Sequence, residues 1–401
     1  MKDIVIIGHF TSDFSIKGND RFSYIGRLLC ENNIVELITS DFSHVTKMKR
    51  SYRKVELPFK VTLVEEPGYS KNICLGRLYS HKVFAGNVKK YLYDRKVPEV
   101  LYCAVPSLDV ADVVVKYAKK KKVKLILDIQ DLWPEAFRMV FHIPVISDLL
   151  FYPMERKANR IYAAADEIVA VSQTYANRAA QVNKNIRKPA IVHLGTDLTR
   201  FDTLKSGKAL LNKPKEEVWM AYVGSISSSY DLCSVIDAMV KMYEEDNTAK
   251  LRFVIMGKGP LEAKLVRYAR KSGVPVTFTG FLAYPEMVAQ LCRCDFAVNP
   301  IRKGSAGSIL NKVGDYAAAG LAVINTQECM EYRKLITTYK AGINCRNGDI
   351  DQLSRVMKRL YTDVTMRSAL GEGNRQLAEA RFDRKVTYPQ ICSYVEERGD
   401  M

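Results

Sequence analysis

The sequence predicts an α/β protein made of two Rossmann-like domains, each a doubly wound parallel sheet between layers of helices. Short apolar runs alternate with amphipathic stretches over most of the 401 residues, a pattern typical of repeated βα units. A polar stretch at residues 196–216 interrupts the alternation, and we expect it to be a linker. The length also exceeds what one hydrophobic core usually serves, so two domains of about 200 residues each are expected.

The expected strands are short apolar runs, because strands buried on both faces of a parallel sheet lack polar alternation. Seven fall in the first domain, at residues 3–8, 34–39, 61–66, 99–105, 124–129, 167–172 and 190–195. Five fall in the second, at residues 218–224, 251–257, 276–281, 295–300 and 321–326. Helical patterns lie between most of them, and the last hundred residues are mostly helical.

The restart of the pattern places the domains at residues 1–197 and 198–384. Ligands of doubly wound sheets bind beyond the carboxyl ends of the strands. Two such sheets facing each other would form an interdomain cleft. The unusual polar and glycine clusters of this sequence follow its predicted strands, so we expect the functional site in that cleft.

The composition sets limits on class and location. The nine cysteines include no CxxC pair, which favours free thiols in a reducing compartment over disulfides or a metal centre. The apolar start is too short for a secretory signal, and no apolar run reaches the roughly 18 residues of a spanning helix. We therefore expect a cytoplasmic protein, either soluble or attached at the inner face of the plasma membrane.

The chain has a net charge of +17, and its first half carries more of this positive charge than its second half. Such a charge suits anionic lipid, diphosphates or nucleic acid, and does not choose among them. The basic run at residues 116–124 is more typical of a solvated helix end than of a dedicated site.

The stretch GSILNKVGDYAAAGLAVI, residues 307–324, reads as a helix that ends near Gly320 and leads into a buried strand. Asn311 and Asp315 are four residues apart and share a helical face, with Lys312 and Tyr316 beside them. An ordinary helix explains the glycine but not this group of polar residues. We expect the face to hold a polar ligand.

Glycine-containing loops follow the other predicted strands of the second domain. Each loop supplies backbone amides or an aromatic ring, and each alone is a weak signal. They contribute Gly224 and Ser225, then Gly257 and Lys258, then Gly280 and Phe281. The loop 299–312, which contains Ser308, would place a diphosphate at the amino end of the next helix, near Arg302, Lys303 or Lys312. Asp315 could then accept hydrogen bonds from a ribose diol, and the helix face would fit a nucleoside diphosphate.

In the first domain, the stretch LDIQDLWPEAF delivers Asp128, Asp131, Trp133 and Glu135 to one strand end. Carboxylates beside a large aromatic ring suit a sugar, through hydroxyl hydrogen bonds and stacking. The alternative is that Asp131 or Trp133 only caps and packs against the following helix.

Two further motifs have structural alternatives. Gly18 and Asn19 precede a helix near Arg21 and could present free amides to an anionic or hydroxylated ligand, although an unremarkable loop explains them equally well. Asp349 and Asp351 have the DxD spacing of some metal-binding transferases. We interpret Asp349 as a helix cap and Asp351 as a first-turn charge.

Taken together, these motifs resemble the GT-B fold glycosyltransferases, specifically the retaining family 4. The resemblance covers nearly the full length and rests on five motifs and the helical tail. The motifs are ADEIVAVSQTYANR, VHLGTDLTRF, MGKGPLEAKL, TGFLAYPEM and NKVGDYAAAGLAVI. The stretch DIQDLWPE looks like the subgroup that acts on bacterial surface polysaccharides such as capsule, which includes aminosugar transferases.

The resemblance implies that the second domain holds a nucleotide sugar, UDP-linked by expectation, and that the first holds a glycan or polyprenyl-diphosphate-linked acceptor. It also implies that a final helix, residues 385–401, packs back onto the first domain, and that the sugar is transferred with retention, without cofactor or metal. Asp315 matches the second glutamate of the family's E-x7-E pair, whereas Gly307 replaces the first. The Arg and Lys that relatives often carry after the first strand of the second domain are missing here, so helix amides and Lys312, Arg302 or Lys303 would meet the charge on the diphosphate. Lys312 and Asp131 are the candidate catalytic residues, and Asp131 would orient or deprotonate the acceptor hydroxyl.

Two alternatives remain open from sequence. A UDP-sugar epimerase of the same fold would bind the donor without an acceptor. A nucleic-acid-binding protein would explain the charge, but the sequence contains no recognised nucleic-acid-binding module, so we expect no nucleic acid as a partner. Residues 137–160 mix large apolar residues with a basic end, which fits either a membrane interface or a buried helix.

Overall fold

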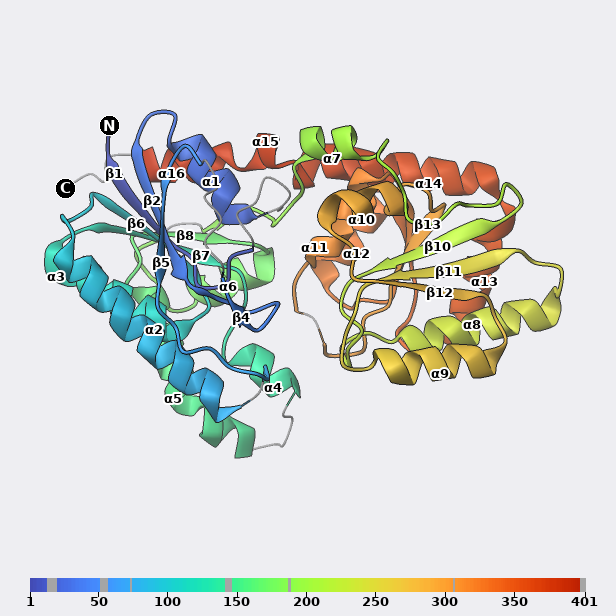
Figure 1. Cartoon of the computed structure of the whole chain (residues 1–401), viewed down its shortest axis with the longest axis horizontal. Coiled ribbons are helices and arrows are strands. Elements are labelled where there is room, and N and C mark those ends of the chain that lie inside the picture. The colour runs from blue at the N-terminus through green and yellow to red at the C-terminus, as the bar shows by residue number, and fades with distance from the viewer. Residues whose placement is uncertain are drawn as a thin grey trace. The chain divides into compact units, whose positions relative to one another are not determined.

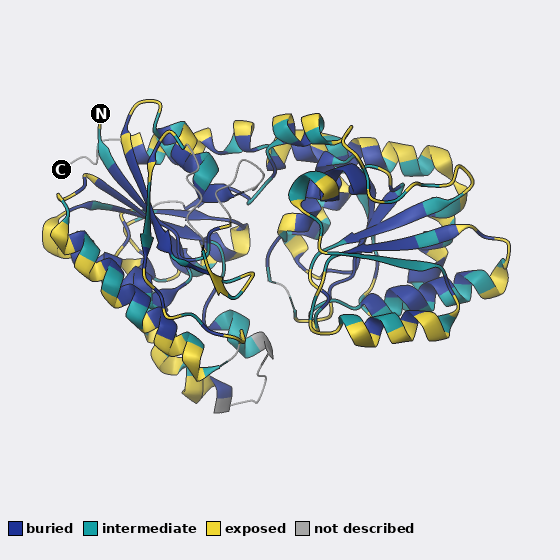
Figure 2. Cartoon of the chain, viewed as in Figure 1, coloured by how far each residue is buried: buried dark blue, intermediate teal, exposed yellow. Residues whose placement is uncertain are grey.

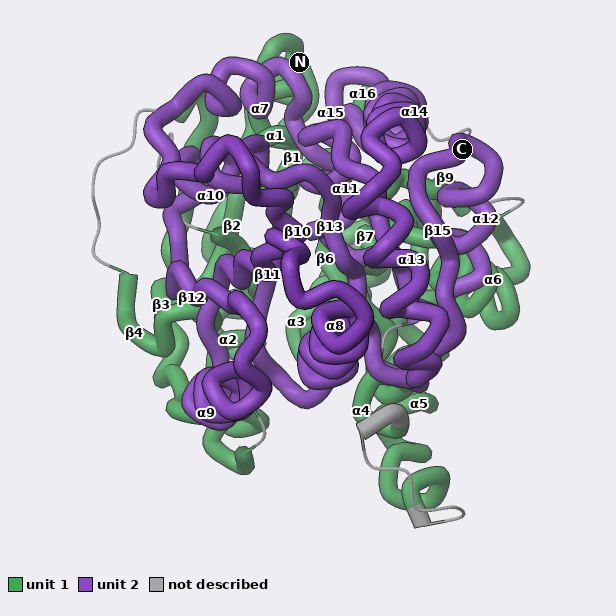
Figure 3. Tube along the Cα trace, turned by 90° about the vertical axis from the view of Figure 1, so that its right-hand side faces the viewer, with its two compact units in different colours: residues 1–193, 387–401 green, residues 194–386 purple. Residues whose placement is uncertain are grey.

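The computed structural model describes residues 1–12, 20–50, 57–72, 74–140, 146–186, 189–305 and 307–396. Its internal contacts divide the chain into two units, coloured separately in Figure 3. Unit 1 comprises residues 1–193 and 387–401, and unit 2 comprises residues 194–386. The first boundary expected from sequence, 197/198, lay four residues further along, and the second, 384/385, lay two residues earlier. The expected cleft between the domains stays a prediction.

Unit 1 is built on a seven-stranded parallel sheet, as the run of apolar segments predicted. Across the sheet the strands are β5 (Lys60–Val64), β2 (Ile34–Ser40), β1 (Asp3–Ile7), β6 (Val100–Val105), β7 (Lys124–Ile129), β8 (Glu167–Ala170) and β9 (Ala190–Ile191). The central strands are almost entirely buried, which Figure 2 shows as dark blue arrows.

Helices cover both faces of this sheet (Figure 1). They are α1 (Arg21–Leu29), α2 (Leu75–Asp94), α3 (Leu108–Lys121), α4 (Glu135–Val140), α5 (Ile146–Ala163), α6 (Gln173–Ala180) and α16 (Pro389–Glu396). Successive strand residues face opposite sides, so Ile4 and Ile6 pack in one core cluster with α1 and α16. Val5 and Ile7, equally buried, face the other layer. The helix α16 therefore packs in the core of unit 1.

Unit 2 repeats the architecture around a six-stranded parallel sheet. Its strands, in order across the sheet, are β12 (Val276–Gly280), β11 (Leu251–Met256), β10 (Val218–Val223), β13 (Phe296–Asn299), β14 (Ala322–Asn325) and β15 (Gly342–Asn344). Met220 and Tyr222 face one helical layer, whereas Trp219 and Ala221 face the other.

The helices of unit 2 lie in these two layers. They are α7 (Leu198–Leu204), α8 (Leu232–Glu245), α9 (Glu262–Ser272), α10 (Tyr284–Leu291), α11 (Asn311–Ala318), α12 (Met330–Tyr339), α13 (Ile350–Thr362) and α14 (Val364–Leu377), followed by the π-helix η1 (Ala378–Phe382). The short α15 (Arg384–Thr387) leads from unit 2 into unit 1.

The expectation that residues 196–216 are only a linker was wrong. Their first part forms α7, which begins at the N-cap Asp197 and buries Leu198 and Phe201 in the core of unit 2. The helix has seven residues, too few to show a helical period in a polar segment. Three short strands were also not predicted: β3 (Phe42–Ser43), β4 (Met48–Lys49) and β15.

Within the described ranges, no helix has both the length and the apolar character that crossing a bilayer requires. All nine cysteines are free thiols, of which Cys103, Cys294, Cys329 and Cys345 are buried.

Candidate donor and acceptor sites

The carboxyl ends of β10 and β11 in unit 2 meet at two glycines. Gly224 and Gly257 have φ angles of 139° and 152°, in a region that side chains rarely adopt. A Cβ on Gly257 would lie 1.9 Å from the Gly224 carbonyl oxygen, so only glycine permits this approach. The two loops that carry these glycines are also hydrogen-bonded, because the Ile226 amide donates to the Lys258 carbonyl at 3.0 Å. The loops predicted to converge here are thus in contact.

The third strand end lies against the second. A Cβ on Gly280, where φ is 72°, would come 3.1 Å from the Lys258 side chain. Lys258, Ser225 and Phe281 are all exposed. These side chains are therefore accessible to a ligand that lies on the backbone of Gly224, Gly257 and Gly280, which we call the glycine floor.

Lys312 lies directly beneath this floor. A Cβ on Gly224 would come within 2.8 Å of the Lys312 Nζ. The ammonium lies 3.7 Å from the centre of the Tyr230 ring and 4.1 Å from that of Tyr222. It is buried, and no hydrogen-bond acceptor reaches it within the described part of the chain. Burial lowers the pKa of the Lys312 ammonium well below its ordinary value.

Lys312 enters this position from the first turn of α11. The N-cap of α11 is Leu310, which supplies no side-chain cap, so the first amides of the helix lack that partner. Asn311, the first residue of the helix, is exposed. The Ser308 Oγ, just before it, is buried without a partner among the described residues. The amino end of α11 therefore offers unused donors beside a buried cation, an arrangement that suits an anion.

Asp315 lies one turn further along and is bonded within unit 2. Its Oδ1 accepts from Thr196 Oγ1 at 3.1 Å and from the Tyr284 hydroxyl at 3.0 Å. Burial raises the pKa of the Asp315 carboxyl to about 6, although both hydroxyl donors oppose the shift. The carboxylate therefore has an internal role in addition to the ribose contact predicted for it.

Tyr316, which was predicted to contact the donor, has a role within unit 2, and the donor contact stays a prediction. Its side chain is fully buried, and its hydroxyl oxygen accepts a hydrogen bond from the Val223 amide at 2.8 Å. It thereby satisfies a backbone amide at the end of β10. The helical period placed it beside Lys312, but its ring points into the core.

A row of amide side chains at the ends of β13, β14 and β15, buried except for the partly buried Asn344, was not predicted. Asn299 donates to Asn325 at 2.9 Å, and Asn325 donates to Asn344 at 2.9 Å. Gln327 continues the row, since its Nε2 donates to the Ser308 carbonyl at 2.6 Å. The row fixes the loop that leads into α11. The recurring asparagine at the end of three successive strands was the available signal.

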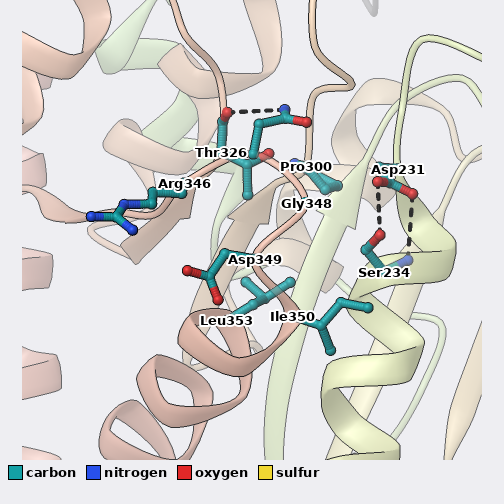
Figure 4. A pocket seen from close by; sticks show the side chains of 10 residues that line it. Asp231, Ser234, Pro300, Thr326, Arg346, Gly348, Asp349, Ile350 and Leu353 are labelled. Carbon is teal, nitrogen blue, oxygen red and sulfur yellow. Dashed lines mark hydrogen bonds between the residues drawn. The ribbon is translucent and has the colours of Figure 1, made fainter.

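The DxD pair is structural, as interpreted from sequence. The Asp349 carboxylate accepts from the Gln352 amide at 2.8 Å and caps α13, and Asp351 pairs with Lys241. Figure 4 shows Asp349 beside a cavity between the starts of α8 and α13. Asp231, on the other side of this cavity, caps α8 by accepting a hydrogen bond from the Ser234 amide. At about 10 Å³ this cavity is no larger than one water requires.

In unit 1, Asp131 lies at the end of β7 and is held by three donors. They are the Leu132 amide at 2.9 Å, the Trp133 Nε1 at 3.2 Å and the Tyr175 hydroxyl at 3.2 Å. Burial raises the pKa of its carboxyl, although these donors oppose the shift. A carboxylate that is oriented and has a raised pKa is suited to accept a proton.

Three of its predicted companions have partners within unit 1, and their assignment to the acceptor stays a prediction. Asp128 is fully buried, and Arg21 donates to both its oxygens, at 2.8 and 3.1 Å. Glu135 pairs with Arg178 at 2.5 Å. Trp133 is buried, with His81 stacked at 6.0 Å and Phe137 at 4.9 Å. Gly18 and Asn19 lie outside the described residues.

A second polar group at this edge of unit 1 was not predicted. His9 follows β1, and its two ring nitrogens lie 2.9 Å from Ser107 Oγ and 2.9 Å from Glu66 Oε2. Glu66 also accepts from Ser40 and Ser80. Burial alone would raise the pKa of Glu66, but these hydrogen bonds, that of His9 above all, hold it at about 2.

Among the described residues, His9, Glu66 and His81 bring their potential metal-binding atoms within 4.8 Å of one another. His9 and Glu66 already bond each other, and Arg77 donates to His81 Nε2 at 3.4 Å. The donor atoms are therefore used within the protein. The expectation of a reaction without metal stays a prediction.

Residues 217–363, within unit 2, match the family model described as Glycosyl transferases group 1. A curated relative is the GDP-mannose-dependent monoacylated alpha-(1-6)-phosphatidylinositol monomannoside mannosyltransferase of Corynebacterium glutamicum. It is 27% identical over 167 residues, which cover 41% of this chain and 43% of that protein. The match thus spans less than half of the relative's length.

Solved structures resemble the chain over almost its whole length. Sucrose-phosphate synthase from Thermosynechococcus elongatus has a TM-score of 0.73 at 14% identity, covering 98% of both chains. Anabaena HepE in complex with UDP has 0.68 at 13% identity, covering 98% of this chain and 99% of that one. WaaG, a glycosyltransferase involved in lipopolysaccharide biosynthesis, has 0.68 at 14%, covering 98% and 100%. At these identities the resemblance establishes the fold.

Proposed function

We propose that this chain, which has the GT-B fold and carries a group 1 glycosyl transferase domain over residues 217–363, is a glycosyltransferase. It would move a sugar from a nucleotide-sugar donor held in unit 2 to a glycan or lipid-linked acceptor held in unit 1. The observation that carries the proposal is the buried ammonium of Lys312, which lies under the Gly224 backbone and has no hydrogen-bond acceptor among the residues that the structure describes.

The chemistry of the leaving group accounts for this ammonium. Breaking the glycosidic bond of a nucleotide sugar leaves a diphosphate, and an oriented cation stabilises that charge in a site shielded from water. An anion above Gly224 would also restore the proton that burial disfavours on Lys312. The uncapped amides of α11 would meet the same anion. Asp315 would position the ribose.

Asp131 would orient or deprotonate the acceptor hydroxyl. Its raised pKa predicts that the reaction slows as the pH falls through that value, because only the carboxylate can accept the proton. Asp131→Asn should lower kcat by about 100-fold or more while donor affinity stays unchanged. A variant with unchanged kcat would remove Asp131 from the mechanism.

We propose UDP as the nucleotide, because HepE is described in complex with UDP and with UDP-glucose. The relative that depends on GDP-mannose makes guanine the main competitor. Retention without metal, an N-acetylated aminosugar and a role in bacterial surface polysaccharide follow from the family 4 resemblance. The description of WaaG supports the last of these.

The acceptor would be reached at a membrane. Leu149 and Leu150 on α5 and Leu75, Leu78 and Tyr79 on α2 are large apolar side chains that unit 1 exposes. With the net charge of +17, such groups favour the surface of an anionic bilayer. Co-sedimentation with anionic vesicles should weaken when Leu149 and Leu150 are both replaced by serine. Equal recovery of both proteins in the supernatant would exclude this attachment.

The test of the proposed function measures binding and turnover separately. UDP and GDP are titrated against the protein and against Lys312→Met, with Lys264→Met as an exposed control in unit 2. Loss of a charge-assisted contact should weaken UDP binding roughly 10- to 100-fold in Lys312→Met only. Equal UDP affinity in both variants would contradict the proposed donor site.

Turnover distinguishes the transferase from the epimerase. The UDP-sugars that bind are incubated with and without acceptor extracts, and released UDP and the sugar are analysed. Release of UDP only with acceptor supports transfer. An isomerised UDP-sugar without acceptor would identify the epimerase.

A further inference from the structure

Two cations of unit 1 are held against the same ring. The Lys47 Nζ lies 4.6 Å from the centre of the Tyr69 ring, and the Arg77 Cζ lies 5.6 Å from it. Asn72 contacts both, because Lys47 donates to its Oδ1 at 2.6 Å and Arg77 donates to its carbonyl at 2.8 Å. The two positive charges are thus fixed near each other.

Neither cation has an opposite charge beside it in the part of the chain that the structure describes. No ion pair joins Lys47 or Arg77 to a carboxylate there. The nearest buried acid, Glu66, is already bonded to His9, Ser40 and Ser80. Burial and then the charge of Arg77 lower the pKa of Lys47, and burial lowers that of Arg77. Bringing like charges together without a counter-charge is unfavourable, and an anion would relieve it.

Arg77 is positioned by aromatic rings. Its guanidinium lies 5.0 Å from the Trp133 ring centre and 5.7 Å from that of Phe10. It has five N–H donors, more than its contacts to Asn72, His81 and Tyr69 use. A planar, oriented guanidinium with unused donors is suited to bind phosphate oxygens.

The cluster is open to ligands and lies at the functional edge of unit 1. Lys47 and Arg77 are both half-buried, so their heads are reachable and also partly shielded from water. Phe10 follows β1, Tyr69 follows β5 and Trp133 follows β7, so the rings come from the carboxyl ends of the strands, as Asp131 does. Leu78 and Tyr79, next to Arg77 on α2, are exposed.

We propose that Lys47 and Arg77 form a phosphoryl-binding subsite, and that the acceptor of the reaction carries a phosphate or diphosphate. The assignment to the acceptor rests on the proposed function, whereas the binding of the phosphoryl group does not. The exposed apolar side chains beside Arg77 favour a lipid-linked diphosphate over a soluble sugar phosphate.

Inorganic pyrophosphate is the probe for the subsite itself. It is titrated against Lys312→Met, which removes the cation of the donor site, and against the same protein with Arg77→Gln or Lys47→Gln. Lys82→Gln in that background is the matched control, because Lys82 is exposed on the same helix as Arg77. Either substitution in the subsite should weaken pyrophosphate binding about tenfold or more, and Lys82→Gln should not. Arg77→Lys should retain part of the affinity.

Equal pyrophosphate affinity in all these variants would overturn the subsite, even if sugar transfer is found. Conversely, loss of pyrophosphate binding in a protein without transferase activity would support the subsite and contradict the proposed function. Melting temperatures without ligand show whether Arg77→Gln still folds, and Lys47→Gln gives an independent result from the second cation of the subsite.

Vesicles and a soluble compound then separate the two sources of the phosphoryl group. Neutral vesicles containing a polyprenyl diphosphate are compared with a soluble sugar 1-phosphate, using wild type and Arg77→Gln. Binding to the vesicles that Arg77→Gln loses supports the lipid-linked acceptor. Binding of the sugar phosphate alone would overturn the lipid assignment.

Discussion

The Lys312 ammonium lies 3.7 Å from the centre of the Tyr230 ring and has no hydrogen-bond acceptor among the described residues. A desolvated cation–π contact contributes about 2 kcal/mol, whereas taking an ammonium out of water costs several kcal/mol. The ring therefore does not offset the cost of burial, and the lowered pKa of Lys312 is the result. The unliganded protein bears a cost that a bound anion would remove.

Lys312→Met should stabilise the unliganded protein by about 1–3 kcal/mol near neutral pH, because it removes a buried group without a partner. The folded protein binds the Lys312 proton less readily than the unfolded chain does. Stability owed to this residue therefore rises with pH from the lowered folded pKa up to about 10.5. The advantage of Lys312→Met in urea unfolding should accordingly be smaller at pH 9 than at pH 7. Lys264→Met should show neither effect, and an advantage that grows with pH would contradict the assignment.

Asp315→Asn should keep the acceptor for Thr196 and Tyr284 but remove the charge. The folded pKa of about 6 is raised above the ordinary 3.8, so the folded protein binds the proton more readily. Stability owed to Asp315 is therefore lost as the pH rises from about 4 to about 6, and Asp315→Asn should lack this loss in urea unfolding. Asp315→Ala, which leaves two buried hydroxyls without an acceptor, should cost about 1–3 kcal/mol. Both should weaken UDP binding, and a UDP affinity equal to wild type would remove Asp315 from the donor site.

Gly257→Ala should destabilise unit 2 by about 3 kcal/mol or more, since its Cβ would lie 1.9 Å from the Gly224 carbonyl at an unfavourable φ. Gly307→Ala is the matched control, because nothing lies within 4 Å of its Cβ position. The measurement is thermal unfolding with soluble yield. Equal melting temperatures for the two variants would show that the loops can separate.

Asp128→Asn should destabilise unit 1 by about 3–5 kcal/mol, because Arg21 would keep a buried charge without its partner. The chain has two tryptophans, Trp133 in unit 1 and Trp219 in unit 2. Fluorescence of Trp133 in a Trp219→Phe background therefore reports the unfolding of unit 1. The acceptor KM of the surviving folded protein should match wild type, and a raised KM would return Asp128 to the acceptor site.

The fold could be predicted almost completely, because every long strand is an apolar run that needs no knowledge of its neighbours. The strands β3, β4 and β15 were missed, since two or three residues show no period. Glycine loops were also predictable, because the φ angles at Gly224 and Gly257 require that residue.

The site was predictable only in part, since burial and partners depend on distant segments. Lys312 contacts the rings of Tyr222 and Tyr230, which belong to β10 and the loop that follows it. Asp128 of β7 pairs with Arg21 of α1, a helix that lies about a hundred residues earlier in the chain. Sequence alone placed both polar residues near a ligand. Both side chains are buried, but Lys312 has no hydrogen-bond acceptor among the described residues, whereas Asp128 is in an ion pair with Arg21. This difference makes Lys312 a candidate catalytic group and Asp128 a structural one.

The last helix, α16, supplies Ile391 and Val395 to the core that Ile4 and Ile6 of β1 begin. The residues of β1 must therefore wait for residues made almost four hundred positions later before that face of the sheet is covered. Until then the nascent chain exposes an apolar face of the unit 1 sheet, while all of unit 2 is synthesised. Chaperone dependence during translation should thus concentrate on unit 1 and not on unit 2.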